Sequence, residues 1–142
     1  MANERPILDQ INLVVKDMDA SMAFYRRLGV ELPEYQPEWD AHHRSAKIGG
    51  GLDFDLDSAV FASQWNEGSR GPTCVVGFKV SSSEAVDALF ADLTGAGYTG
   101  QQAPYDAFWG ARYAIVQDPD GNPVGLMGPI SASLRRDVEP PA

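Results

Sequence analysis

Residues 7–29 read ILDQINLVVKDMDASMAFYRRLG, and residues 73–97 repeat their pattern as TCVVGFKVSSSEAVDALFADLTGAG. Each stretch opens with alternating apolar residues, which predict a strand with one buried face because neighbouring side chains point to opposite sides. Asp or Ser residues that can cap a helix come next. An apolar period of three to four residues and then a glycine follow. Each stretch therefore predicts a strand followed by a helix.

Adding 65 to the numbers of the first stretch superposes the two patterns. The apolar positions then coincide in pairs: Leu13 with Phe78, Val15 with Val80, Ala20 with Ala85, Phe24 with Leu89, Tyr25 with Phe90 and Leu28 with Leu93. Shorter strand-like runs follow the helices, near residues 41–48 and 52–56 in the first copy and near 111–117 and 123–127 in the second. The matching caps and glycines indicate an internal repeat.

The repeat predicts an α+β fold in which paired βαβββ modules form a curved mixed sheet around a cleft. The expected divisions are an N-terminal extension (1–6), a first module (7–57), a linker (58–71), a second module (72–130) and a flexible C-terminal tail (131–142). Because one helix covers one sheet face, the other face is expected to line the cleft. Those positions are Gln10, Asn12 and Val14 in the first copy and Val75, Gly77 and Lys79 in the second.

The charge balance excludes some partners. The chain has 20 acidic and 11 basic residues, a net charge of −9, so nucleic acid and anionic membranes are disfavoured. The same charge suits a cationic small molecule, although acidity can also serve solubility alone. The single cysteine, Cys74, excludes an internal disulfide and is expected to be a small buried hydrophobe. No export signal is visible, so a cytoplasmic protein is expected.

Three motifs carry a family resemblance: INLVVKDMDASMAFYRRLGV (11–30), FKVSSSEAVDALFADLTGAGY (78–98) and DPDGNPVGL (118–126). Together they resemble the vicinal oxygen chelate superfamily, which includes glyoxalase I, extradiol dioxygenases, and fosfomycin- and bleomycin-resistance proteins. The resemblance covers about residues 7 to 128 and implies the paired-module fold. It implies function only weakly, since one fold hosts many chemistries. It also implies a homodimer, with the modules pairing within one chain or between two.

The resemblance further implies where metal ligands would lie, usually His on each opening strand and Glu on the closing strands. Carried over by position, these slots are Gln10, Val75 and Gly125, with either Asp53 or Asp55 as the fourth. Val and Gly have no donor, neutral Gln is a poor ligand, and one carboxylate cannot hold a catalytic divalent ion. The prediction is therefore no metal, no other cofactor and no assigned catalytic residue.

Two histidines, His42 and His43, could build a different site. Neighbours on a strand point to opposite faces, so both cannot easily bind one ion. His43 joined to Asp53 or Asp55 would make only a weak metal site. The favoured interpretation is one exposed histidine and one hydrogen-bonded at the rim of the sheet.

Acidic and aromatic side chains remain as candidates for ligand contact. Asp53, Asp55 and Asp57 alternate with apolar residues, so three carboxylates share one strand face. That face would favour an amine or guanidinium ligand, or would form an acidic edge that discourages sheet pairing. Aromatic residues in the expected loops suit a planar ligand, although Phe108 and Trp109 could instead close the core or a dimer contact. These loop residues are Tyr35, Trp39, Trp65, Tyr105, Phe108 and Trp109.

The sequence thus favours a metal-free protein, similar to bleomycin-resistance members, that sequesters an aromatic or cationic small molecule. Ten residues are expected to contact the ligand: Gln10, Asn12, Trp39, His43, Asp53, Asp55, Tyr105, Phe108, Trp109 and Tyr113. Two alternatives stay open. One is a lyase, isomerase or dioxygenase with a non-standard site, including acid–base chemistry by an Asp and His43. The other is a small interaction module.

Overall fold

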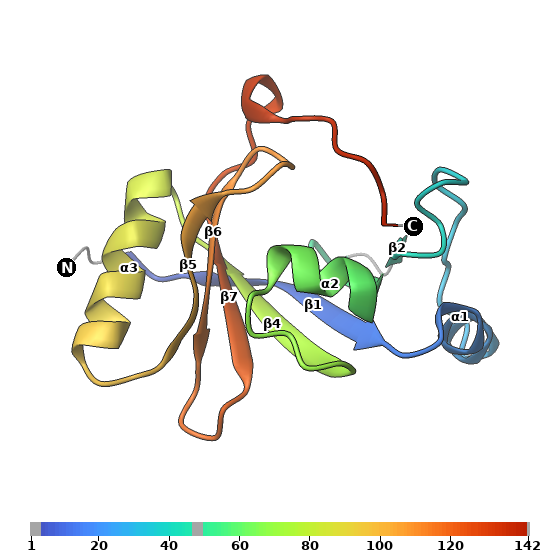
Figure 1. The fold of residues 1–142 in the computed structure, drawn as a ribbon, viewed down its shortest axis with the longest axis horizontal. Helices are drawn as coiled ribbons and strands as arrows, with labels where there is room; N and C mark the ends of the chain where they lie inside the picture. The colour runs from blue at the N-terminus through green and yellow to red at the C-terminus, as the bar shows by residue number, and fades with distance from the viewer. Residues whose placement is uncertain (1–3, 47–49, 142) are drawn as a thin grey trace. The chain divides into compact units, whose positions relative to one another are not determined.

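The computed structural model describes residues 4–46 and 50–141 (Figure 1). Contacts divide the chain into two compact units. The N-terminal unit comprises Asp9–Val75 and the described part of Glu139–Ala142, and the C-terminal unit comprises Val76–Val138 and the described part of Met1–Leu8. The boundaries follow the two copies of the sequence repeat, so each copy builds most of one unit.

Three strands and two helices form the N-terminal unit within its described residues: β1 (Ile7–Val15, which begins in the other unit), α1 (Met18–Arg27), β2 (His43–Ala46), β3 (Asp53–Ser58) and α2 (Ala59–Trp65). The strand order is β2-β3-β1, with β3 parallel to β1 and antiparallel to β2. One sheet face packs on α1 in a core that holds Leu13, Val15, Met22 and Leu56. The opposite face is left for polar side chains.

A βαβββ module makes up most of the described C-terminal unit: β4 (Thr73–Lys79, which begins in the other unit), α3 (Ser83–Gly95), β5 (Gly100–Asp106), β6 (Arg112–Gln117) and β7 (Pro123–Met127). The strand order is β4-β7-β6-β5, with β7 parallel to β4 and antiparallel to β6. Helix α3 packs on β5, β6 and β7, and its core includes Val80, Val86 and Leu126 (Figure 1). The predicted α+β class with paired modules and mixed sheets is confirmed.

The helix caps reproduce the repeat. The carboxylate of Asp17 accepts from the backbone N–H of Ala20 at 3.0 Å, and the hydroxyl of Ser82 accepts from Ala85 at 3.0 Å. Ser82 lies 65 residues after Asp17, and Ala85 lies 65 residues after Ala20, as the repeat predicts. Each helix ends at a glycine with positive φ, +100° at Gly29 and +103° at Gly97, a conformation that a side chain would strain. α3 is one turn longer than α1, so the second glycine comes three residues later than the offset predicts.

Two elements lie where the sequence predicts loops. The expected linker 58–71 contains α2, which begins at the Ser58 cap and buries Phe61, Ala62 and Trp65. The segment before Phe108 contains β5, an edge strand with register shifts and an internal Pro104. Edge strands tolerate proline and irregular pairing, so β5 lacks the alternation that identifies an inner strand.

Other expectations differ in detail. Cys74 is exposed, so the prediction of a buried hydrophobe is wrong: β4 turns Val75 inward and the thiol outward. In the tail expected to be flexible, Ala132–Leu134 forms a 3₁₀ turn and the N–H of Arg136 donates to the Phe108 carbonyl at 2.8 Å. Residues 47–49, at the end of the expected strand 41–48, lie outside the described residues. No described helix is long and apolar enough to cross a membrane.

Candidate functional site

A polar network occupies the face of the N-terminal sheet that points away from α1. The strand register places Asn12 beside Asp55 and His43 beside Asp57. Because side chains alternate along each strand, Gln10 shares this face with these four residues. Asp53, opposite Gln10, and Ser45, opposite Asp55, lie on the same face. Three strands with the packing of α1 behind them therefore hold seven polar side chains in one layer.

Asp57 is the centre of the network. Its carboxylate accepts from His43 Nδ1 at 2.5 Å, from Trp65 Nε1 at 3.0 Å and from Asn12 Nδ2 at 3.2 Å. The residue is only 2% exposed. A buried carboxylate is stable only when donors surround it, and these three supply that need. Donors within the protein thus satisfy both carboxylate oxygens of Asp57.

His43 is held between Asp57 and Ser45, each of which contacts one ring nitrogen. Burial alone would lower its pKa, but the hydrogen bond to Asp57 and the charges of Asp57 and Asp55 outweigh that effect, so the pKa is raised. The Asp57 bond uses Nδ1, which leaves Nε2 3.3 Å from the hydroxyl oxygen of Ser45. The His43 side chain is 29% exposed, and its ring meets Phe61 edge-on at a centroid distance of 5.9 Å.

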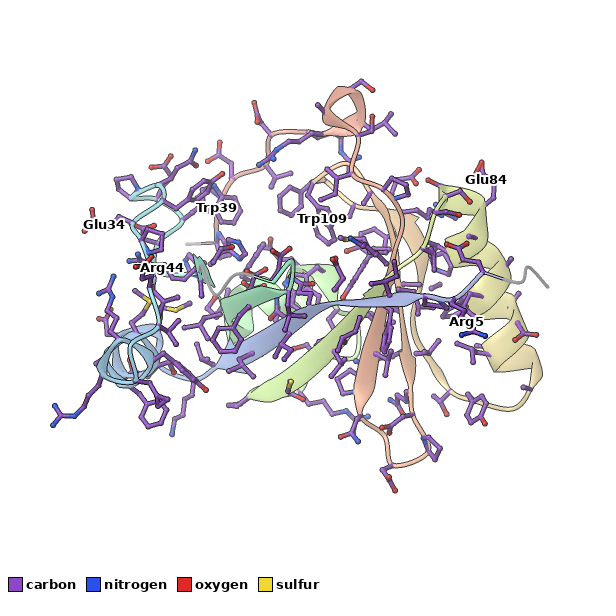
Figure 2. All side chains as sticks on the ribbon, turned by 180° about the vertical axis from the view of Figure 1, so that it is seen from behind. Arg5, Glu34, Trp39, Arg44, Glu84 and Trp109 are labelled. Carbon is purple, nitrogen blue, oxygen red and sulfur yellow. The ribbon has the colours of Figure 1, made fainter. Side chains whose placement is uncertain are left out.

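Asp55 is also buried, but fewer hydrogen-bond donors surround it than surround Asp57. Its carboxylate accepts from Gln10 Nε2 at 2.6 Å and from the hydroxyl of Ser45. It is 7% exposed, and burial raises its pKa, opposed by the charge of His43 and reinforced by that of Asp57. Among the described residues no Lys or Arg pairs with it. Arg44, on the other face of β2, donates instead to the carbonyl of Asp40 at 2.9 Å (Figure 2).

One buried acceptor in the network has no donor. Asn12 is 7% exposed, and its Oδ1 lacks a hydrogen-bond partner among the described residues. The amide orientation follows from Asp57, because a carboxylate only accepts and so requires the Nδ2 side. Asn12 Oδ1 is therefore a buried acceptor that no donor satisfies among the described residues.

Aromatic side chains gather separately in the C-terminal unit. Trp109 meets Tyr113 and Phe108 edge-on, each at a centroid distance of 5.3 Å, and Tyr105 meets Tyr113 at 6.2 Å. Trp109 Nε1 donates to the sulfur of Met127 at 3.2 Å (Figure 2). Burial raises the pKa of the Tyr105 phenol, which stays protonated at neutral pH. The four predicted aromatic contact residues of this unit thus form one ring cluster.

The same cluster closes one of the metal slots that the family resemblance implied. A β-carbon placed on Gly125 would lie 2.7 Å from Tyr113 Oη and 3.2 Å from its Cε1. No side chain, and so no Glu, fits there without moving the ring. Val75, a second slot, is buried at 2% exposure and has no donor atom.

The register also decides between the two aspartates. Gly125 pairs with Gly77, and Asp55 pairs with Asn12, which is 65 residues before Gly77. Asp55 is therefore the counterpart of Gly125, and Asp53 is an exposed neighbour. Among the described residues no three His, Cys, Asp or Glu side chains are gathered as a metal ion requires. The residues present do not fit the metal centre of the metal-dependent members.

The predicted contact residues thus fall into two groups. Gln10, Asn12, His43 and Asp55 come together in the N-terminal unit, where Trp39 stacks edge-on against Phe61 at 5.2 Å. The sequence reasoning omitted Asp57, Trp65 and Ser45 from the contact residues. The strand alternation had already placed Asp57 on this face, but only the fold of α2 brings Trp65 to it.

The histidine prediction needs correction. Both histidines are hydrogen-bonded: His43 to Asp57, and His42 Nδ1 to the hydroxyl of Ser58 at 2.9 Å. The expected exposed member does not exist because Ser58, at the start of α2, reaches the ring of His42. His43 also pairs with Asp57 instead of Asp53 or Asp55, since the antiparallel register sets it opposite Asp57.

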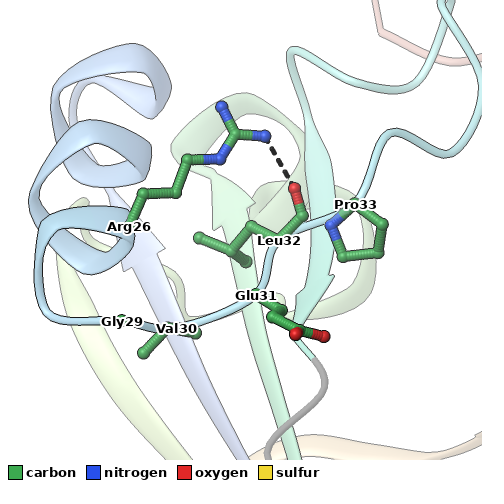
Figure 3. A pocket seen from close by; sticks show the side chains of 6 residues that line it. All are labelled: Arg26, Gly29, Val30, Glu31, Leu32 and Pro33. Atoms are coloured by element: carbon green, nitrogen blue, oxygen red, sulfur yellow. Dashed lines mark hydrogen bonds between the residues drawn. The ribbon is translucent and has the colours of Figure 1, made fainter.

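A pocket of about 460 Å³ lies elsewhere in the N-terminal unit, after α1 (Figure 3). It is open, and its lining runs from Arg26 through Gly29 to Pro33. The guanidinium of Arg26 already donates to the Leu32 carbonyl at 2.6 Å. None of the residues expected to contact a ligand lines it.

The fold and these sites define a protein built from paired βαβββ modules, with a polar network in the N-terminal unit and a ring cluster in the C-terminal unit. Residues 7–126 match the model of the glyoxalase/bleomycin resistance protein/dioxygenase superfamily. The chain belongs to this superfamily. No curated protein matches it in sequence.

Several solved structures have the same fold at low identity. Methylmalonyl-CoA epimerase from Mycobacterium tuberculosis is 21% identical, with a TM-score of 0.58 over 92% of this chain and 93% of its own. The Mn(II)-bound glyoxalase from Novosphingobium aromaticivorans is 21% identical, with a TM-score of 0.60 over 94% of this chain and 43% of its own. A superfamily member from Vibrio splendidus 12B01 is 17% identical, with a TM-score of 0.57 over 88% of this chain and 98% of its own.

Proposed function

We propose that this protein binds a small organic molecule, aromatic or cationic, and releases it unchanged, without using a metal ion. One contrast carries the proposal. Asp55 keeps a buried, hydrogen-bonded carboxylate at a position where metal-dependent relatives place a ligand, while its counterpart Gly125 is covered by Tyr113. This chain has hydrogen-bonding groups suited to an organic ligand on the N-terminal sheet, and at Val75 and Gly125 it has no donor for a metal ion.

The two side-chain groups support this ligand class in different ways. The acidic network of the N-terminal unit favours a positively charged group. The ring cluster around Trp109 offers edges and faces to a planar group. Sequestration by a homodimer, as the family resemblance implies, is part of the proposal.

Metal content and ligand binding test the proposal together. The purified protein is analysed for metal as isolated and after incubation with Zn²⁺, Ni²⁺, Mn²⁺ and Fe²⁺. It is then screened against planar and cationic compounds by quenching of its three tryptophans. Substoichiometric metal with saturable binding supports the proposal. One metal per chain retained through dialysis overturns the metal-free part.

A second candidate function has its own observation. The 2.5 Å hydrogen bond to Asp57 orients His43 through Nδ1, and the hydroxyl of Ser45 is the neighbour of Nε2, so the imidazole is held by a carboxylate as a general base would be. The enzyme would then move a proton within its ligand, as an isomerase does. Recovery of the bound compound and its analysis by mass spectrometry and by deuterium incorporation from D₂O separates the two. A changed or deuterated compound, lost in His43→Gln, favours the enzyme.

A further inference from the structure

We propose that Asn12 Oδ1 and the Asp55 carboxylate together form a subsite for an organic cation with at least two N–H donors, such as an amidinium or a guanidinium. This rests on the proposed binding function and specifies which part of the ligand the N-terminal unit recognises. The two residues are direct register partners on β1 and β3. Adjacent strands lie about 4.8 Å apart, so one forked cation can reach acceptors on both.

The need for a cation comes from Asp55. Asp57 has the imidazole of His43 as its partner, but the groups that donate to Asp55 are the neutral amide of Gln10 and the neutral hydroxyl of Ser45. With His43 protonated, the network still holds two carboxylates against one positive charge. The charge of His43 also acts on Asp55, but its hydrogen bond goes to Asp57. A buried carboxylate whose hydrogen-bond donors are all neutral is costly, and a cationic ligand lowers that cost.

The need for a second donor comes from Asn12. Its Oδ1 is buried and has no partner among the described residues, whereas its Nδ2 is fixed on Asp57. A buried amide oxygen without a donor loses its hydration and gains nothing in return. A cation that offered one N–H to Asp55 and another to Asn12 would satisfy both groups at once.

The two oxygen groups of the subsite favour an organic cation over a metal ion. One carboxylate and one amide oxygen fall short of the six or more oxygens that Ca²⁺ takes, and the described residues contain no third acidic or imidazole ligand in place. Arg and amidinium groups have flat N–H forks that match paired oxygen acceptors. The Trp65 indole, bonded to Asp57 in the same network, gives a fluorescence reporter beside the subsite.

Benzamidine is the probe, and benzamide of nearly the same shape is its neutral control. Each is titrated into the full chain at low ionic strength and followed by tryptophan fluorescence and calorimetry. We expect benzamidine to bind and benzamide to bind at least about tenfold more weakly, as loss of a charge-assisted hydrogen bond implies. On the ¹⁵N-labelled protein, the side-chain amide signals of Asn12 should shift with benzamidine.

Matched variants separate the subsite from the general acidity of the chain. Asp55→Asn and Asp53→Asn remove the same charge from β3, one buried and one exposed. Asp55→Asn should weaken benzamidine binding about tenfold or more, and Asp53→Asn less than twofold. Equal weakening by both would show a diffuse charge effect and overturn the subsite. If Asp55→Asn does not fold, unmoved Asn12 signals in the saturated wild type overturn it equally.

The outcomes also distinguish the subsite from the broader function. If benzamide and other neutral planar compounds bind as tightly as benzamidine, the subsite is wrong and the binding function stands. If neither cationic nor neutral compounds bind, both proposals fail. Stoichiometric Zn²⁺ binding that is lost in Asp55→Asn would overturn the subsite and the metal-free function together.

Discussion

The phenolic oxygen of Tyr113 lies 2.7 Å from the point where a β-carbon would stand on Gly125. Both residues belong to the β6–β7 pair of the C-terminal unit, whose register brings Ile115 opposite Gly125 and Tyr113 opposite Met127. A long aromatic side chain two residues away therefore leans over the glycine. The ring of Tyr113 therefore fills the space that a side chain at position 125 would occupy.

This arrangement predicts that Gly125→Ala destabilises the protein by about 1–3 kcal/mol, because an added carbon overpacks a close contact. Tyr113→Phe removes the nearest atom but leaves ring carbons at 3.2 and 3.3 Å, so it should relieve part of that cost. Urea unfolding of the two single variants and the double variant measures the coupling. Costs that simply add would show that Tyr113 does not fill the site.

A second prediction concerns the donor from α2 to the network. Trp65→Phe keeps most of the buried ring but removes the N–H that donates to Asp57. The free energy of unfolding should fall by about 1–3 kcal/mol, since Asp57 loses one donor while it stays buried. Gln64→Ala, at the neighbouring exposed position of the helix, is the control and should stay within about 0.5 kcal/mol. Equal losses in both variants would contradict the role of Trp65.

A third prediction follows from the raised pKa of His43. The folded state binds the proton more tightly than the unfolded state, whose His pKa is near 6.5. The stabilisation is therefore complete below pH 6.5 and is lost as pH rises through the folded pKa. The stability difference between wild type and His43→Gln should shrink over that interval, as measured by urea unfolding at closely spaced pH values. A difference that grows with pH would contradict the ion pair.

The control for the third prediction is Asp57→Asn, which removes the carboxylate whose hydrogen bond and charge raise the pKa of His43. In that background His43→Gln should change the pH dependence much less. Asp55 also has a raised pKa, and its contribution has the same sign at lower pH, above 3.8. The same measurements on Asp55→Asn separate its contribution from that of His43.

The sequence predicted the repeat because the evidence for it is local. A capping residue such as Asp17 or Ser82, an apolar helical period and a glycine at the helix end act within a few turns of chain. The alternation on β3 likewise placed Asp55 and Asp57 on one face. Strand alternation and the helical period depend on the local backbone, and the tertiary contacts of this fold did not change either of them.

The missed parts of the site depend on tertiary placement. Trp65 reaches Asp57 only because the seven-residue helix α2 folds over the sheet, and so short a helix gives little periodic signal. The choice of Asp57 over Asp53 as the partner of His43 depends on the β2–β3 register. A shift of one residue would have turned the imidazole to the other face.

The last prediction joins the histidine to the cation subsite. When His43 loses its proton, the network loses one positive charge. The acidic residues on the same face of β3 are Asp53, Asp55 and Asp57. The network's members from β1, Gln10 and Asn12, and the Trp65 indole from α2 carry no charge. Benzamidine stays cationic throughout the pH range used.

Benzamidine should therefore bind more tightly as pH rises through the pKa of His43, because an imidazolium repels the ligand and a neutral imidazole does not. Calorimetric titrations at several pH values and constant ionic strength measure this dependence. In His43→Gln the dependence over the same interval should disappear, while affinity at low pH should exceed that of the wild type. Affinity that falls with rising pH would mean that the ligand binds away from His43, and the subsite at Asn12 and Asp55 would be wrong.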